Sequence, residues 1–155
     1  LQALEASPPQ GLQVADLGCG SGVLGLAALA LGAERVLAAD TDSLAERSTR
    51  DNASLNGLDE DHLMVRQGSV ETLALMHAGV QSQLLLCNIL APVIEALAPH
   101  FTSVLAPGGR GLLSGLLVEQ APRLTSVLEE LGWTVVALRS QGSWGLMEIS
   151  RVESA

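Results

Sequence analysis

The chain has 155 residues, 48% of them hydrophobic and 16% charged, so one folded domain with a sizeable core is expected and disorder is not. A net charge of −9 repels a phosphate backbone, and one Phe, two Trp and no Tyr offer few rings for base stacking, so direct nucleic-acid binding is not expected. There is neither an apolar run of membrane length nor a signal peptide at the start, so no membrane contact is expected either.

Strands and helices are predicted to alternate along the chain, because short apolar runs alternate with helix-type periodicity. The expected elements are a helix tail at 1–6, strand 12–17, helix 23–31 ended by Gly32, strand 36–39, a helix opened by a capping box at Ser43–Glu46 and ended by Gly57, strand 62–67, helix 70–77, strand 83–87, a striped helix from Ile89 to Val104, a turn at 106–109, strand 111–117, helix 119–131, and closing strands 133–138 and 143–150. This order predicts an α/β fold with a doubly wound, mostly parallel sheet in which one of the last two strands runs antiparallel.

A glycine turn after the first strand is the strongest indication of a ligand site. Asp16, Gly18 and Gly20 precede a predicted helix, at the carboxyl end of a buried strand where open α/β sheets bind ligands. The helix start would also offer free N–H groups to an anion. The dinucleotide pattern G-x-G-x-x-G fails because Val23 stands at its third glycine, and Asp16 suits a donor such as an ammonium group. The other interpretation is a tight turn without a ligand.

Polar residues at the ends of the next strands extend this site. Asp40 lies where α/β nucleoside-binding folds hold ribose hydroxyls, although it could instead cap a helix. Ser69 and Val70 follow the third strand, where an adenine edge would lie. Asn88 ends a buried strand, and its amide oxygen and the Ile89 carbonyl would accept hydrogen bonds from an amine; the alternative is a helix cap.

Other reactive side chains are not expected to take part. Cys19 and Cys87 fall in predicted buried elements, which indicates apolar filler in a reducing, cytoplasmic setting. The three histidines lack metal-ligand spacing, so no metal is expected. Trp144 is assigned to core or hairpin packing.

Two sets of motifs match known families. The stretch Asp16–Gly22, Asp40 and the stretch Leu105–Arg110 resemble class I S-adenosylmethionine-dependent methyltransferases, whose seven-stranded Rossmann-like sheet has an antiparallel last strand. More narrowly, the chain resembles the ribosomal protein L11 methyltransferase family. The stretches that carry this likeness are 40–42, 52–57, 88–91, 113–117 and 142–144.

The resemblance implies methyl transfer from S-adenosylmethionine to lysine side chains and the N-terminal amine of a ribosomal protein. It implies substrate orientation by Asn88 and Ile89. The implied cofactor contacts are Asp16, Gly18, Cys19, Gly20, Asp40, Thr41, Ser69, Val70 and Asn88. Another protein-lysine methyltransferase, a catalytically silent binding module and a nicotinamide-dependent oxidoreductase are the alternatives.

The resemblance also bears on domain organisation. Residues 1–155 correspond to one catalytic domain, and the family's N-terminal substrate-recognition domain and its cofactor-covering segment lie upstream of the matched motifs. We therefore expect the chain to be a fragment that binds the cofactor weakly and methylates little alone.

Overall fold

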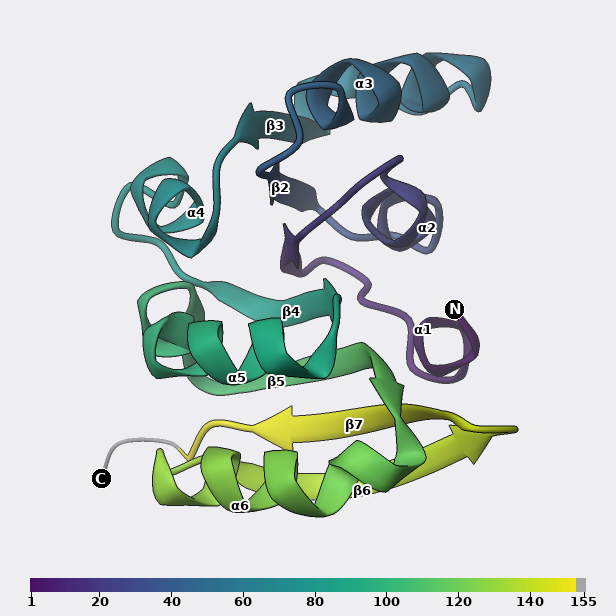
Figure 1. The fold of residues 1–155 in the computed structure, drawn as a ribbon. Helices are drawn as coiled ribbons and strands as arrows, with labels where there is room; N and C mark the ends of the chain where they lie inside the picture. Colours follow the sequence, from purple (N-terminus) through teal and green to yellow (C-terminus); the bar gives the residue numbers. More distant parts are fainter. Residues whose placement is uncertain (153–155) are drawn as a thin grey trace.

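A computed structural model, in which residues 1–152 are described, contains one seven-stranded sheet in the order β3-β2-β1-β4-β5-β7-β6 (Figure 1). The strands are β1 (Gln13–Leu17), β2 (Arg35–Asp40), β3 (Leu63–Gln67), β4 (Ser82–Asn88), β5 (Leu105–Leu117), β6 (Thr134–Gln141) and β7 (Trp144–Ser150). The α-helices are α1 (Gln2–Ala6), α2 (Val23–Ala30), α3 (Ala45–Leu55), α4 (Val70–Met76), α5 (Ala91–Leu97) and α6 (Ala121–Glu130), and the short 3₁₀ helices are η1 (Glu60–His62), η2 (Ala98–Ser103) and η3 (Val118–Gln120).

The directions of the strands confirm the predicted topology, a mostly parallel sheet with one antiparallel strand near its end. Strands β1 to β5 pair in parallel, whereas β7 lies between β5 and β6 and runs antiparallel to both. The last two strands have no helix between them, so they form a hairpin instead of a crossover.

Helices cover both faces of the sheet (Figure 1), so the central strands are buried on both sides. Along β2, Leu37 and Ala39 pack into the core under α4, α5 and α6, and Val36 and Ala38 pack into the core under α1, α2 and α3. This two-sided burial explains why β2 and β4 read as unbroken apolar runs in the sequence.

Three local predictions are wrong. The capping box at Ser43 does not form, because α3 begins at Ala45 and the Asp42 Oδ1 accepts the Leu44 N–H at 2.9 Å instead. The helix expected up to Val104 ends at Leu97 and continues as the 3₁₀ helix η2, whose Pro99 lacks the N–H that an α-helix needs. The turn at 106–109 lies inside β5, where its register with β4 shifts.

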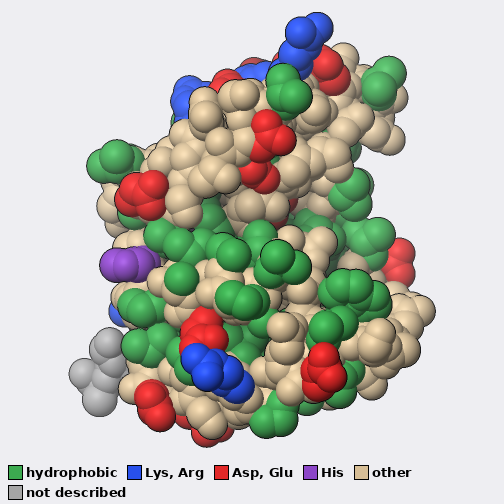
Figure 2. All heavy atoms as spheres, in the orientation of Figure 1, with side chains coloured by type: hydrophobic (Ala, Val, Ile, Leu, Met, Phe, Trp, Pro, Cys, Tyr) green, Lys and Arg blue, Asp and Glu red, His purple; other side chains and the backbone are tan. Residues whose placement is uncertain are grey.

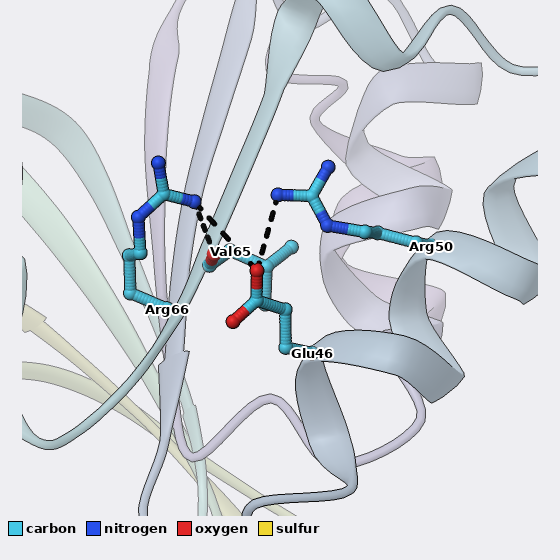
Figure 3. A network of polar contacts seen from close by, with 4 residues as sticks. All are labelled: Glu46, Arg50, Val65 and Arg66. Atoms are coloured by element: carbon cyan, nitrogen blue, oxygen red, sulfur yellow. Dashed lines mark hydrogen bonds and ion pairs between the residues drawn. The ribbon is translucent and has the colours of Figure 1, made fainter.

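Arginine side chains tie α3 to the edge strand β3 (Figure 3). Glu46 Oε1 lies 3.3 Å from Arg50 Nη2 and 3.8 Å from Arg66 Nη1, which also donates to the Val65 carbonyl at 2.7 Å. Figure 2 shows basic side chains gathered over α3 at the top of the molecule. These pairs are partly exposed, so each contributes at most about 1 kcal/mol.

Candidate functional site

The carboxyl ends of three neighbouring strands meet at one edge of the sheet. Leu17 of β1 pairs with Ala39 of β2 and with Cys87 of β4. The next residue of each strand therefore extends the same row, which brings Gly18 between Asp40 and Asn88. The structure thus places the glycine turn between the ends of the two strands that carry these polar residues.

Two carboxylates lie on the β1–β2 side of this edge. Asp16 is 2% exposed, and its Oδ2 accepts the Gly25 N–H of α2 at 3.1 Å. Burial raises the pKa of Asp16 to about 7; the Gly25 hydrogen bond opposes this rise and the charge of Asp40 adds to it. The Asp40 oxygens accept the N–H groups of Gly20 and Asp42, both at 2.8 Å. A cation bound here would relieve the repulsion between the two acids.

The N–H groups of the glycine turn are already used. Gly18 and Cys19 donate to the Ala39 carbonyl at 2.8 and 3.1 Å, and Gly20 donates to Asp40. These three N–H groups of the turn are therefore not free for an anion; the predicted free N–H groups belong to the start of α2, where Gly25 donates to Asp16. A Cβ at Gly20 would meet nothing within 4 Å, whereas one at Gly18 would lie 2.6 Å from Ile89 Cγ2. Gly18 packs against Ile89, and Gly20 faces open space.

The two cysteines are unreactive, as the sequence predicts. Cys19 is 8% exposed, with Sγ 3.9 Å from Thr49 Oγ1, and burial followed by the charge of Asp16 raises its pKa to about 12. Burial also raises the pKa of Cys87. Both therefore stay protonated thiols at neutral pH, and Cys19 can offer a ligand little but its backbone.

The residues assigned to the adenine side lie at the β2–β3 end of the same edge. The Gly68 N–H donates to the Asp40 carbonyl at 2.8 Å, and Gln67 Nε2 donates to the Thr41 carbonyl at 3.2 Å. Thr41 is exposed and Ser69 is partly exposed, but Val70 is 3% exposed and packs into the core. Only the backbone of Val70 is left for a ligand.

Asn88 differs from its predicted environment. It is exposed although its strand is buried, and the N-cap of α5 is Leu90, which makes no side-chain cap, so the helix-cap interpretation is wrong. Its Oδ1 accepts a hydrogen bond from Ser114 Oγ at 3.2 Å, and the Ile89 N–H donates to the Ser114 carbonyl at 3.2 Å. Strand β5 thus fixes the orientation of both residues.

A cavity of about 510 Å³ opens in front of Asn88. It is lined by Asn88, Ile89, Leu90, Ser114, Gly115, Trp144 and Gly145. Trp144 is 55% exposed, so of its two expected places, core or hairpin, the core is wrong; the residue begins β7 of the hairpin and lines this cavity. Ser114 and Gly115 were used only as family markers; a Ser-Gly pair inside a long apolar strand is the signal that could have placed them here.

Neither a group of metal-binding side chains nor a membrane-spanning helix occurs within residues 1–152. Within residues 1–152, the His, Cys, Asp and Glu side chains form no group of three or more that could hold a metal ion. None of the helices in that range has the length and apolar character of a membrane span.

The antiparallel β7 and the glycine turn held between two carboxylates define a Rossmann-like methyltransferase domain. The solved structure of the ribosomal protein L11 methylase of Lactobacillus delbrueckii subsp. bulgaricus has this fold, with a TM-score of 0.85, 31% identity, and coverage of 98% of this chain and 76% of that chain. Residues 1–152 match the family model described as ribosomal protein L11 methyltransferase (PrmA). The chain belongs to that family.

Sequence relatives agree with this assignment. The ribosomal protein L11 methyltransferase of Parasynechococcus marenigrum is 66% identical over 151 residues, which cover 97% of this chain and 52% of the relative. That of a Prochlorococcus marinus strain is 63% identical over 151 residues, covering 97% and 50% respectively. The chain thus spans about half the length of the curated relatives it matches.

Proposed function

We propose that this chain is the S-adenosylmethionine-dependent catalytic domain of a methyltransferase that acts on lysine side chains and the N-terminal amine of a ribosomal protein, in the cytoplasm. Family membership supports the reaction class. The observation that carries the proposal is the position of the cavity at Asn88, along the same sheet edge as the two carboxylates of Asp16 and Asp40.

The residues at the β1–β2 end fit this cofactor. Its methionine part carries an ammonium group, which suits the desolvated Asp16 carboxylate, and its ribose hydroxyls suit Asp40. Each Asp40 oxygen accepts one N–H and has a further lone pair for a hydroxyl donor. The backbone of Gly18, Cys19 and Gly20 would border the methionine, and Thr41, Ser69 and Val70 would border the adenine.

The residues at the β4 end fit an amine. Asn88 Oδ1 and the Ile89 carbonyl are acceptors at the cavity wall, so they would hold the amine by its N–H groups and direct its lone pair. The apolar surroundings of Ile89, Leu90 and Trp144 would lower the pKa of an ammonium group and favour loss of its proton to solvent. When bound, S-adenosylmethionine supplies a sulfonium methyl group, whose C–S bond breaks as the amine lone pair forms the new N–C bond. Positioning is then the main task of the chain.

A nicotinamide-dependent oxidoreductase is disfavoured by the same geometry. A pyrophosphate needs N–H donors at the glycine turn, and those of Gly18, Cys19 and Gly20 are donated within the chain. A methyltransferase of another protein and a catalytically silent module share the fold, and only experiment separates them from the proposal.

Cofactor binding can be tested with matched carboxylate variants. Asp40 and Asp59 each accept the N–H two residues ahead at 2.8 Å, but only Asp40 lies at the candidate site. We expect calorimetric titration with S-adenosylmethionine to show at least a tenfold loss of affinity for Asp40→Ala, roughly the loss of one charge-assisted hydrogen bond. Asp59→Ala should bind like the wild type. Equal affinity of both variants, or no binding by any of the three proteins, would contradict the proposal.

Methyl transfer needs a separate assay. We would replace the matching 151-residue segment of the Parasynechococcus marenigrum relative with this chain. The chimera should methylate ribosomal protein L11, and the isolated chain should methylate it only weakly. Asn88→Ala should lower the turnover of the chimera. A chimera that binds the cofactor but transfers no methyl group to this substrate would point to another substrate or to a silent module.

A further inference from the structure

A second cavity lies next to the first. Its volume is about 550 Å³, and it is bordered by α1 and by the β6–β7 hairpin. Ser114, Trp144 and Gly145 line both cavities, so they form a common wall. Across the hairpin, Trp144 pairs with Leu117 of β5 on one side and with Gln141 of β6 on the other.

The lining of this second cavity is more apolar than polar, but it carries a positive charge. Gln2, Ser140 and Gln141 contribute polar groups, and Arg139 is the one charged side chain among the described lining residues. Arg139 is exposed and forms no ion pair within residues 1–152, whereas Arg110 lies 3.5 Å from Glu148. No carboxylate of the described residues therefore neutralises the positive charge of Arg139, although the net charge of the chain is −9.

The charge suggests what the second cavity binds. The amine to be methylated belongs to a polypeptide, so the polypeptide on either side of it must pass over the residues that line the first cavity. Strand β6 is at the edge of the sheet, where an extended segment can approach, and the wall of Ser114, Trp144 and Gly145 leads to Arg139. A carboxylate on that segment would form a charge-assisted hydrogen bond with the guanidinium group.

We propose that the second cavity receives the substrate segment that flanks the methylated amine, and that Arg139 selects for an acidic side chain in that segment. This inference rests on the proposed function, because it takes the first cavity as the amine site. Arg139 is thereby a specificity residue, and it takes no part in methyl transfer.

Charge reversal tests this assignment. The chimera described above would be assayed with two lysine peptides that differ only in having Asp or Arg residues beside the target lysine. We expect the wild type to favour the acidic peptide about fivefold in kcat/KM, mainly through KM, as befits one partly exposed ion pair. Arg139→Glu should reverse the preference. Arg47→Glu makes the same change of charge on α3, at a side chain that is 86% exposed, and should leave the preference as it is.

The outcomes separate the two proposals. Methylation of both peptides with equal kcat/KM, or the same response to Arg139→Glu and Arg47→Glu, would overturn the role of Arg139 while leaving the amine site intact. Absence of methylation of peptides and of ribosomal protein L11 alike would overturn both. Loss of the preference at high salt, with kcat unchanged, would support the ion pair.

Discussion

Gly115 is the position where the candidate site depends most directly on the absence of a side chain. Its φ is +83°, and a Cβ there would lie 2.6 Å from the Ile89 carbonyl oxygen and 2.9 Å from Asn88 Oδ1. The register between β5 and β7 shifts at this point. Gly115→Ala should therefore displace the two acceptors proposed to hold the substrate amine.

The size of the effect can be separated into two parts with a matched control. Gly132, at the end of α6, has a φ of +90°, but a Cβ there would meet nothing within 4 Å. Gly132→Ala should cost only the backbone strain, about 1–2 kcal/mol. Gly115→Ala adds an overpacking cost of about 1–3 kcal/mol, because the atoms it meets belong to backbone and to a hydrogen-bonded amide. The expected total is about 2–5 kcal/mol.

Urea unfolding, monitored by circular dichroism, measures the stability of both variants. Methylation by the corresponding chimeras measures the effect of each substitution on turnover. We expect Gly115→Ala to be the less stable variant and to lose turnover under conditions where it remains folded, whereas Gly132→Ala keeps wild-type turnover. If the two variants are equally stable and both methylate normally, the close approach of Gly115 to Asn88 and Ile89 does not govern the site.

Two pH-dependent predictions follow from buried ionisable groups, and they have opposite signs. Folding raises the pKa of Asp16 from 3.8 to about 7, so the folded state binds an extra proton between these values and stability falls as the pH rises through this window, by about 4 kcal/mol in all. Asp16→Asn should flatten this fall in urea titrations at pH 4–8 while weakening cofactor binding; an unchanged slope would show that Asp16 is ionised at little cost. His77, hydrogen-bonded to Ser82 Oγ at 2.7 Å, has a pKa lowered from 6.5 by burial, so its contribution is lost as the pH falls through about 6.5. His77→Gln should reduce that loss, measured as the difference in unfolding free energy between pH 7.5 and 5.5, and an equal loss in variant and wild type would contradict the assignment.

The sequence predicted the fold well because the signals for it are local. Unbroken apolar runs mark β2 and β4, and Gly32 and Gly57 end helices with φ of +101° and +64°. The failures occurred where a neighbouring residue offered a better partner. Asp42 accepts the Leu44 N–H ahead of α3, where a capping box at Ser43 was expected, and Pro99 lies in the 3₁₀ helix that follows α5.

The candidate site was predicted only in part, because sequence position does not show exposure. Asp16, Asp40 and Asn88 could be placed on one edge from strand order alone. The exposure of Asn88 and Trp144 depends on how β5 and β7 meet, and the register shift at Ser114 and Gly115 that brings them together is a tertiary feature. The hydrogen bond between His77 and Ser82, five residues ahead, is a further contact that the sequence alone did not indicate.

The direction of β7 explains why the hairpin can serve the site at all. Because β7 runs antiparallel to β5, it begins beside the carboxyl end of β5, with Trp144 paired to Leu117. The turn between β6 and β7 therefore lies at the same edge as Asn88, and Arg139 and Gln141 lie beside it at the end of β6. A parallel β7 reached through a crossover helix would start at the opposite edge, about 20 Å away for a strand of this length. If the cavity at Asn88 is the amine site, the pairing of these two strands without a helix between them thus determines from which face a protein substrate would approach it.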